Sequence, residues 1–182
     1  MFLIFLAGWL GTAQAAPQVG AQAYALLEAS TGRALLEGNA DAELPMASTT
    51  KVMTCLLAIE EGNLDAVVEV PDEAVGVEGS SMYLQRGETL TLRDLLYGLM
   101  LASGNDAAVT IAVYIAGSVE NFAAKMNERA RELGAEHTHF VTPNGLPAEG
   151  HYTTARDLAK ISAYAMGNEA FREIVGTSSK NL

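Results

Sequence analysis

The chain has 182 residues, a formal net charge of -11 and a hydrophobic content of 49%. These values are typical of one globular domain with its own core, and they exclude a disordered or fibrous sequence. The acidic balance argues against nucleic acid and against anionic membrane surfaces as partners, because both require clustered Lys and Arg.

Residues 1–16 are almost entirely apolar and end near Ala13-Gln14-Ala15. A short apolar core before a small-x-small site is typical of a secretory signal peptide, and the run is too short to predict a membrane span. An apolar first strand or helix of the domain is the alternative. We therefore expect residues 17–182 to be exported, to the periplasm or the extracellular face of the cytoplasmic membrane, with no membrane anchor in this chain.

The first half of the domain alternates short strands with one buried helix. Residues 22–28 and 33–38 predict two strands joined by a turn at Gly32. The run after Pro45 is apolar on nearly all sides, which predicts a deeply buried helix that ends at Gly62. Residues 64–88 predict a loop region with one short strand.

The second half is mainly helical. Capping residues Thr91, Ser118 and Thr154 each precede an apolar pattern with helical spacing. They predict helices that end before Ser103, Gly134 and Gly167, and the pattern predicts further helices over 106–115 and 169–175. The segment 135–152 is irregular.

Ser48 and Lys51 lie three residues apart at the start of the buried helix. On a helix this spacing places both side chains on one face, where a hydroxyl and an amine can share a proton. A serine needs such an acceptor when it attacks, and lysine serves only when it is neutral. Burial together with a neighbouring positive charge can lower the lysine pKa to about 7, a shift that costs about 4 to 5 kcal/mol. The alternative is that Ser48 caps the helix and Lys51 extends to solvent.

A tight corner between two predicted helices holds Ser103-Gly104-Asn105. Alternate side chains at such a corner can both point into one cavity, although a corner alone requires only a glycine and a cap. The irregular segment holds His137, His139 and His151, but neither a helical His pair nor a carboxylate cluster supports a metal site, so we expect no metal and no cofactor. Cys55 is the only cysteine, which excludes an intrachain disulfide, and we expect it in the core.

Six spaced motifs occur in an order that resembles one family. These motifs are Met46-Ala47-Ser48-Thr49-Thr50-Lys51, Gly79-Ser80-Ser81-Met82, Ser103-Gly104-Asn105-Asp106-Ala107, Phe122 with Met126-Asn127, Asn144-Gly145-Leu146, and Tyr152-Thr153-Thr154-Ala155 with Asp157-Leu158-Ala159. The sequence resembles the serine D-alanyl-D-alanine carboxypeptidases of the S11 type, the low-molecular-mass penicillin-binding proteins of the bacterial cell envelope. The resemblance implies an α+β fold of the DD-peptidase/β-lactamase-like (transpeptidase-like) type, with N-terminal strands and a helical subdomain.

The resemblance also implies roles for individual residues. Ser48 would be the acylated nucleophile, Lys51 the general base, and Ser103 part of the proton relay to the leaving group. The substrate would be bound by Asn105, by Ser81 on a loop beside the site, and by Asn144, Gly145 and Leu146. The reaction would remove the terminal D-alanine from a peptidoglycan stem peptide ending in D-Ala-D-Ala through a Ser48 ester. The β-lactams would form a longer-lived ester at the same serine.

The Lys-Thr-Gly motif of the family occurs nowhere in the sequence. In the family that part supplies the last sheet strands, an oxyanion-hole N–H and a lysine that holds the substrate carboxylate. We therefore expect residues 17–182 to be an incomplete catalytic domain without its C-terminal sheet strands, and we expect this chain to be inactive or less active. A non-catalytic muropeptide-binding module is one alternative. A serine β-lactamase is another, although Ser-Asp-Asn would be expected at Ser103-Gly104-Asn105.

Overall fold

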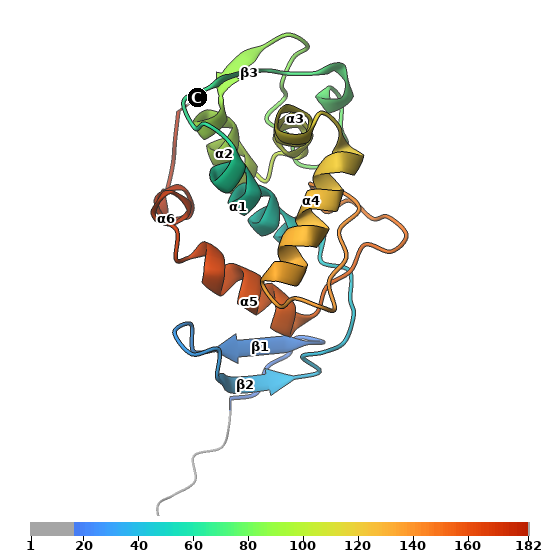
Figure 1. Ribbon diagram of the computed structural model, residues 1–182, viewed down its shortest axis with the longest axis vertical. Coiled ribbons are helices and arrows are strands. Elements are labelled where there is room, and N and C mark those ends of the chain that lie inside the picture. Colours follow the sequence, from blue (N-terminus) through green and yellow to red (C-terminus); the bar gives the residue numbers. More distant parts are fainter. Residues whose placement is uncertain (1–16, 182) are drawn as a thin grey trace, which may run out of the picture.

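Helix α1 (Lys51–Glu61) lies at the centre of the computed structural model, which describes residues 17–181 (Figure 1). Its side chains from Met53 to Ala58 are all buried, as the apolar run predicted. The five other α-helices pack around it: α2 (Leu92–Leu101), α3 (Asn105–Ala116), α4 (Val119–Glu132), α5 (Ala155–Ala165) and α6 (Glu169–Gly176). The predicted signal peptide, residues 1–16, lies outside the described residues.

The predicted buried helix begins as a 3-10 turn, η1 (Ala47–Thr50), before α1 takes over at Lys51. The amide of Thr49 donates to the carbonyl of Met46 over 3.2 Å, the shorter spacing of a 3-10 turn. Ala47 has a φ of 45°, a left-handed value that is uncommon outside glycine. The chain therefore enters the helix through a sharp turn directly before Ser48.

The first predicted hairpin is present. Strands β1 (Tyr24–Leu27) and β2 (Ala34–Gly38) pair antiparallel with Tyr24 opposite Gly38, and Gly32 has a φ of 71° in the connecting turn. This sheet lies at one end of the molecule, beside α5 (Figure 1).

A second two-stranded sheet joins β3 (Val67–Glu69) to β4 (Thr89–Thr91), with the 3-10 turn η2 (Asp72–Ala74) in the connection. The sequence predicted only one short strand in this region. Strand β4 was not predicted because it is only three residues long and is followed directly by α2. Its alternation of polar and apolar residues is therefore too short to recognise in the sequence.

The predicted caps are confirmed at three helices. The side chains of Thr91, Ser118 and Thr154 each accept a hydrogen bond from the backbone N–H three residues later. Gly117 ends α3 in the left-handed conformation, with a φ of 78°. Residues 135–152 contain no helix or strand, as predicted, and two isolated bridges join His139 to Tyr152 and Leu44 to Thr153.

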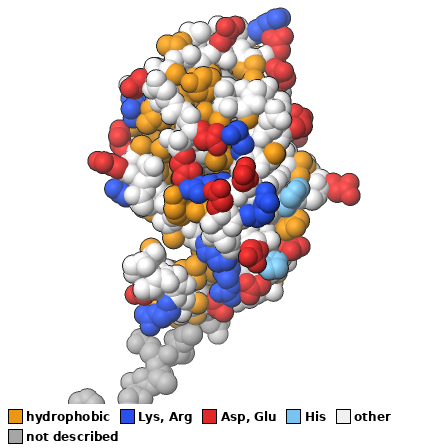
Figure 2. Space-filling model, viewed as in Figure 1, with side chains coloured by type: hydrophobic (Ala, Val, Ile, Leu, Met, Phe, Trp, Pro, Cys, Tyr) orange, Lys and Arg blue, Asp and Glu red, His pale blue; other side chains and the backbone are white. Residues whose placement is uncertain are grey.

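Acidic and basic side chains are interspersed over the face shown in Figure 2. Several form ion pairs, such as Arg129 with Glu60 at 2.7 Å and Arg156 with Asp41 at 2.6 Å. In the described part of the chain no single helix has both the length and the apolarity to cross a membrane, while α3 and α4, bent by 83° at their junction, would meet that test only as a pair.

Candidate active site

Lys51 and Ser48 face one another at the junction of η1 and α1. The ammonium nitrogen Nζ of Lys51 lies 3.3 Å from Oγ of Ser48, as their spacing predicted. Lys51 is only 2% exposed, whereas Ser48 opens to solvent. Burial lowers the pKa of Lys51 to about 8, because a charged amine is poorly solvated there. A neutral lysine is therefore accessible near neutral pH, beside an exposed serine hydroxyl.

Two further oxygens surround the amine of Lys51. Nζ donates to Oδ1 of Asn105 over 2.7 Å and to the backbone carbonyl of Asn144 over 2.8 Å. Both contacts are shorter than the 3.3 Å contact to Ser48. The amine of Lys51 is thus held by α3 and by the 142–147 loop, from residues far away in the sequence.

Ser103 completes the group of side chains around Ser48. Its hydroxyl donates to Oγ of Ser48 over 3.1 Å. Ser103 has a φ of 56°, so both it and Ala47 occupy the left-handed region at residues other than glycine. Such a conformation costs on the order of 1 kcal/mol and is concentrated at functional sites. The strain here lies in the two backbone turns that bring the two serines together.

The 142–147 loop packs directly on the start of α1. Thr54 Oγ1 donates to the carbonyl of Pro143 over 2.6 Å. A Cβ on Gly145 would lie 1.9 Å from the carbonyl oxygen of Ala47, and Gly145 has a φ of 88°. Only glycine permits this approach, which places the carbonyl of Asn144 against Lys51. The Asn144 side chain turns back instead, and its Oδ1 accepts from the N–H of Leu146 over 3.0 Å.

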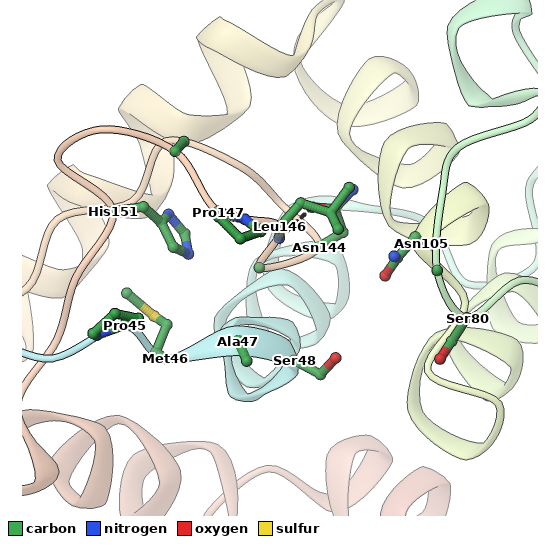
Figure 3. Close-up of a pocket in the computed structure, with 13 residues that line it drawn as sticks. Pro45, Met46, Ala47, Ser48, Ser80, Asn105, Asn144, Leu146, Pro147 and His151 are labelled. Atoms are coloured by element: carbon green, nitrogen blue, oxygen red, sulfur yellow. Dashed lines mark hydrogen bonds between the residues drawn. The ribbon is translucent and has the colours of Figure 1, made fainter.

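A cavity of about 370 Å³ opens at this site. Figure 3 shows Ser48 below the loop that carries Asn144, Leu146 and Pro147, with Asn105 and Ser80 to the right of both. The lining residues come from four parts of the chain: Pro45, Met46, Ala47 and Ser48; Gly79 and Ser80; Asn105; and Asn144, Gly145, Leu146, Pro147, Ala148 and His151. Predicted residues Ser48, Asn105, Asn144, Gly145 and Leu146 therefore line one cavity.

Ser81 lies outside this lining. Its hydroxyl donates to Oδ2 of Asp106 over 2.7 Å and accepts from the N–H of Tyr83 over 2.9 Å. The neighbouring Ser80 lines the cavity instead. The structure therefore gives Ser81 a contact to α3, while its predicted substrate contact stays a prediction.

His151 and Thr50 were not among the site residues predicted from the sequence. His151 is buried at the cavity, and its Nε2 lies 2.9 Å from the hydroxyl of Thr50. The only sequence signal was the presence of His151 in an irregular segment, which did not distinguish it from His137 and His139. Among residues 17–181, no group of three or more His, Cys, Asp or Glu side chains could hold a metal ion.

Solved structures with similar folds come from the penicillin-binding proteins. Penicillin binding protein 6B from Escherichia coli matches with a TM-score of 0.87 and 33% identity, over 94% of this chain and 58% of that one. A D-alanyl-D-alanine carboxypeptidase from Mycobacterium tuberculosis matches with a TM-score of 0.86 and 36% identity, over 90% of this chain and 62% of that one. The fold is therefore of the DD-peptidase class, as the resemblance implied.

The sequence comparisons agree with the structural ones. A family model described as D-alanyl-D-alanine carboxypeptidase, Peptidase_S11, matches residues 11–182. The carboxypeptidase DacF of Bacillus subtilis is 39% identical over 162 residues, and DacC of Escherichia coli is 39% identical over 157 residues. These matches cover 86% and 80% of this chain but only 42% and 39% of the two relatives. The chain belongs to the D-alanyl-D-alanine carboxypeptidase family.

Proposed function

We propose that this chain carries the nucleophile half of a serine-type D-Ala-D-Ala carboxypeptidase. Ser48 attacks the carbonyl between the two terminal D-alanines of a peptidoglycan stem peptide, forms an ester and releases D-alanine. Water then hydrolyses the ester. The observation that carries the proposal is the position of Lys51 Nζ, which lies within hydrogen-bonding distance of Ser48, Asn105 and Asn144 at once.

The three contacts of Lys51 suit a general base. A neutral amine has two N–H bonds and one lone pair. Its N–H bonds point to the two closer acceptors, Oδ1 of Asn105 and the carbonyl of Asn144. The lone pair is then directed at the hydroxyl of Ser48, the longest of the three contacts. As the bond from Ser48 Oγ to the substrate carbonyl forms, the serine proton passes to Nζ.

Ser103 is suited to deliver a proton to the leaving group. When the carbon–nitrogen bond to the terminal D-alanine breaks, the departing amine needs one proton. The hydroxyl of Ser103, 3.1 Å from Oγ of Ser48, can transfer its own proton and recover one from Lys51. The backbone N–H of Ser48, at the first turn of the helix, is the donor that we assign to the developing oxyanion.

The cavity agrees with a short extended peptide as substrate. Asn105 and Ser80 form one wall, and the 144–147 loop forms another, so the stem peptide would lie between them with its scissile carbonyl over Ser48 (Figure 3). The β-lactams would acylate the same serine. We expect this activity on the outer side of the cytoplasmic membrane, where peptidoglycan lies and where the predicted signal peptide would direct the chain.

Intact mass spectrometry of the purified chain after incubation with benzylpenicillin tests the proposal. We expect one added penicillin mass on the wild-type chain and none on Ser48→Ala, with circular dichroism to show that both proteins are folded. A folded wild-type chain without an adduct would overturn the proposal and favour the muropeptide-binding alternative. A penicillin that is released rapidly as hydrolysed product would favour the β-lactamase alternative.

A further inference from the structure

Asp106 is a buried carboxylate next to the active site that the proposed reaction does not use. It is 1% exposed, yet it forms no ion pair among the described residues. Its oxygens accept four hydrogen bonds: from the hydroxyl of Ser81 at 2.7 Å and from the backbone N–H groups of Met82, Leu84 and Ala107 at 3.0, 3.0 and 2.9 Å. Burial raises the pKa of Asp106, but these hydrogen bonds outweigh it and hold the pKa below its usual value.

Three of the four donors belong to one segment, residues 78–84, which these bonds hold against the first turn of α3. The carboxylate of Asp106 accepts hydrogen bonds from Ser81, Met82 and Leu84, so one side chain holds all three residues of the segment. Met82 provides a second anchor, because its sulfur packs so closely on Gly98 of α2 that a Cβ there would lie 1.9 Å away. The segment is therefore held to two helices.

The same segment determines how the amide of Asn105 is oriented. The carbonyl of Ser80 accepts from the backbone N–H of Asn105 over 2.8 Å, and the carbonyl of Glu78 accepts from Nδ2 of Asn105 over 2.7 Å. A carbonyl can only accept, so the NH₂ group of Asn105 must face Glu78. Its oxygen is then left to face Nζ of Lys51.

From these contacts we propose that Asp106 is a positioning residue: by holding segment 78–84 against α3, it keeps the carbonyl of Glu78 in place, orients the Asn105 amide, and so aligns Lys51 with Ser48. The consequence for the chemistry rests on the proposed function. The contacts from Asp106 to Asn105 and Lys51 do not depend on the proposed function. They determine the orientation of the Asn105 amide and the protonation of Lys51, and both can be measured without any catalytic activity.

The substitution Asp106→Asn isolates this role. The Asn side chain would have an NH₂ group in place of one carboxylate oxygen. At the position of Oδ1 this NH₂ would face the backbone N–H groups of Met82 and Ala107, and at the position of Oδ2 it would face the N–H of Leu84. In either orientation two donors face each other without an acceptor. The segment would then lift from α3 and release the amide of Asn105. The ammonium form of Lys51 would lose its closest acceptor, so its pKa would fall further below the usual value.

The experiment compares Asp106→Asn with the wild type and with Asp94→Asn. Asp94 is a matched control, because its carboxylate accepts from the hydroxyl of Thr91 within the cap of α2, its one side-chain partner among the described residues. Two quantities are measured against pH: the titration of Lys51, from the ¹³C NMR shift of its Cε, and the rate of acylation by a fluorescent penicillin. Hydrogen exchange at the amides of Met82 and Leu84 reports whether the segment has been released.

We expect Asp106→Asn to move the Lys51 titration to lower pH, to speed amide exchange at Met82 and Leu84, and to lower the plateau rate of acylation about 10-fold. Asp94→Asn should change none of these. An unchanged Lys51 titration in a variant whose segment exchanges rapidly would overturn the inference, since a purely structural role predicts a slower rate without a shift.

Two outcomes separate the inference from the proposed function. If the wild type is not acylated, the proposed function fails, and the Lys51 titration and amide exchange still decide the role of Asp106. If Asp106→Asn does not fold, Ser81→Ala replaces it, because it removes one donor from the segment to Asp106 and leaves the two backbone bonds from Met82 and Leu84. A smaller shift of the Lys51 titration in the same direction supports the inference, and no shift overturns it.

Discussion

The hydroxyl of Thr50 lies 2.9 Å from Nε2 of His151, a residue 101 positions later in the chain. On the other side of the ring, Nδ1 accepts from the backbone N–H of Val141 over 2.9 Å. Since Nδ1 accepts, the proton of the neutral ring is on Nε2 and is donated to Thr50. His151 therefore connects the 3-10 turn that carries Ser48 to Val141, directly before the 142–147 loop.

Two replacements of His151 should distinguish the contributions of its hydrogen bonds to Thr50 and to Val141. Asn can place an oxygen near the position of Nδ1 and keep the acceptor for Val141, whereas Gln reaches toward Thr50 and leaves the Val141 N–H without a partner. A buried N–H that loses its acceptor costs about 1 to 3 kcal/mol. We expect His151→Gln to lower the free energy of unfolding by about 1 kcal/mol more than His151→Asn, as measured by urea denaturation. The reverse order would contradict the assigned tautomer.

The stability of the chain should also depend on His151 through pH. Burial, and then the charge of His139, lower the pKa of His151 below its usual value of 6.5. The unfolded chain therefore binds a proton at this histidine before the folded chain does, and stability is lost as pH falls below 6.5 toward the folded pKa. Above pH 6.5 His151 is neutral in both the folded and the unfolded chain, so its full contribution to the free energy of unfolding is present. In urea denaturation below pH 6.5, the free energy of unfolding should fall less steeply with decreasing pH for His151→Asn than for the wild type.

Lys51 should govern the pH dependence of acylation. Its pKa of about 8 means that the fraction of neutral amine rises as the pH increases through that value. Well below pH 8 the rate of penicillin acylation should rise about tenfold per pH unit, and above it the rate should level off. Lys51→Arg should not be acylated at any of these pH values, because a guanidinium stays charged. A flat profile for the wild type would exclude Lys51 as the base.

Gly145→Ala should disrupt the site as well as the fold. The new Cβ would meet the carbonyl of Ala47 at a position with a φ of 88°, so the loop must move away from α1. We expect a loss of about 3 kcal/mol in the free energy of unfolding and little or no acylation.

Gly117→Ala is the control for this substitution. Gly117 has a similar φ of 78° but open space around its Cβ position, so only the backbone strain of about 1 kcal/mol should appear. Similar losses in unfolding free energy for the two variants would show that the contact with Ala47 has no importance of its own.

Cys55 should be inert toward thiol reagents in the folded chain. It is fully buried in α1, and burial raises the pKa of its thiol to about 12. The thiolate that reacts is then nearly absent at neutral pH. Labelling by a chromogenic disulfide should proceed only at the rate at which the chain unfolds, and it should become rapid in denaturant. Rapid labelling without denaturant would contradict this burial.

The sequence by itself determined the features that depend on near neighbours in the chain. The caps at Thr91, Ser118 and Thr154 are bonds between residues three positions apart, so a short pattern contains both partners. The pairing of Ser48 with Lys51 follows in the same way from one helical turn. Burial of the α1 helix could be predicted because its apolar residues cover nearly every side.

Only the tertiary structure decided which distant groups meet at the site. The contact of Lys51 with Asn144 runs through a backbone carbonyl, which no side-chain motif reveals, and it spans 93 positions. The orientation of Asn105 depends on the carbonyl of Glu78, and the placement of Ser80 in the cavity instead of Ser81 depends on Asp106. These contacts are set by how loops pack on helices. That packing depends on the shape of the whole core, which a local pattern does not contain.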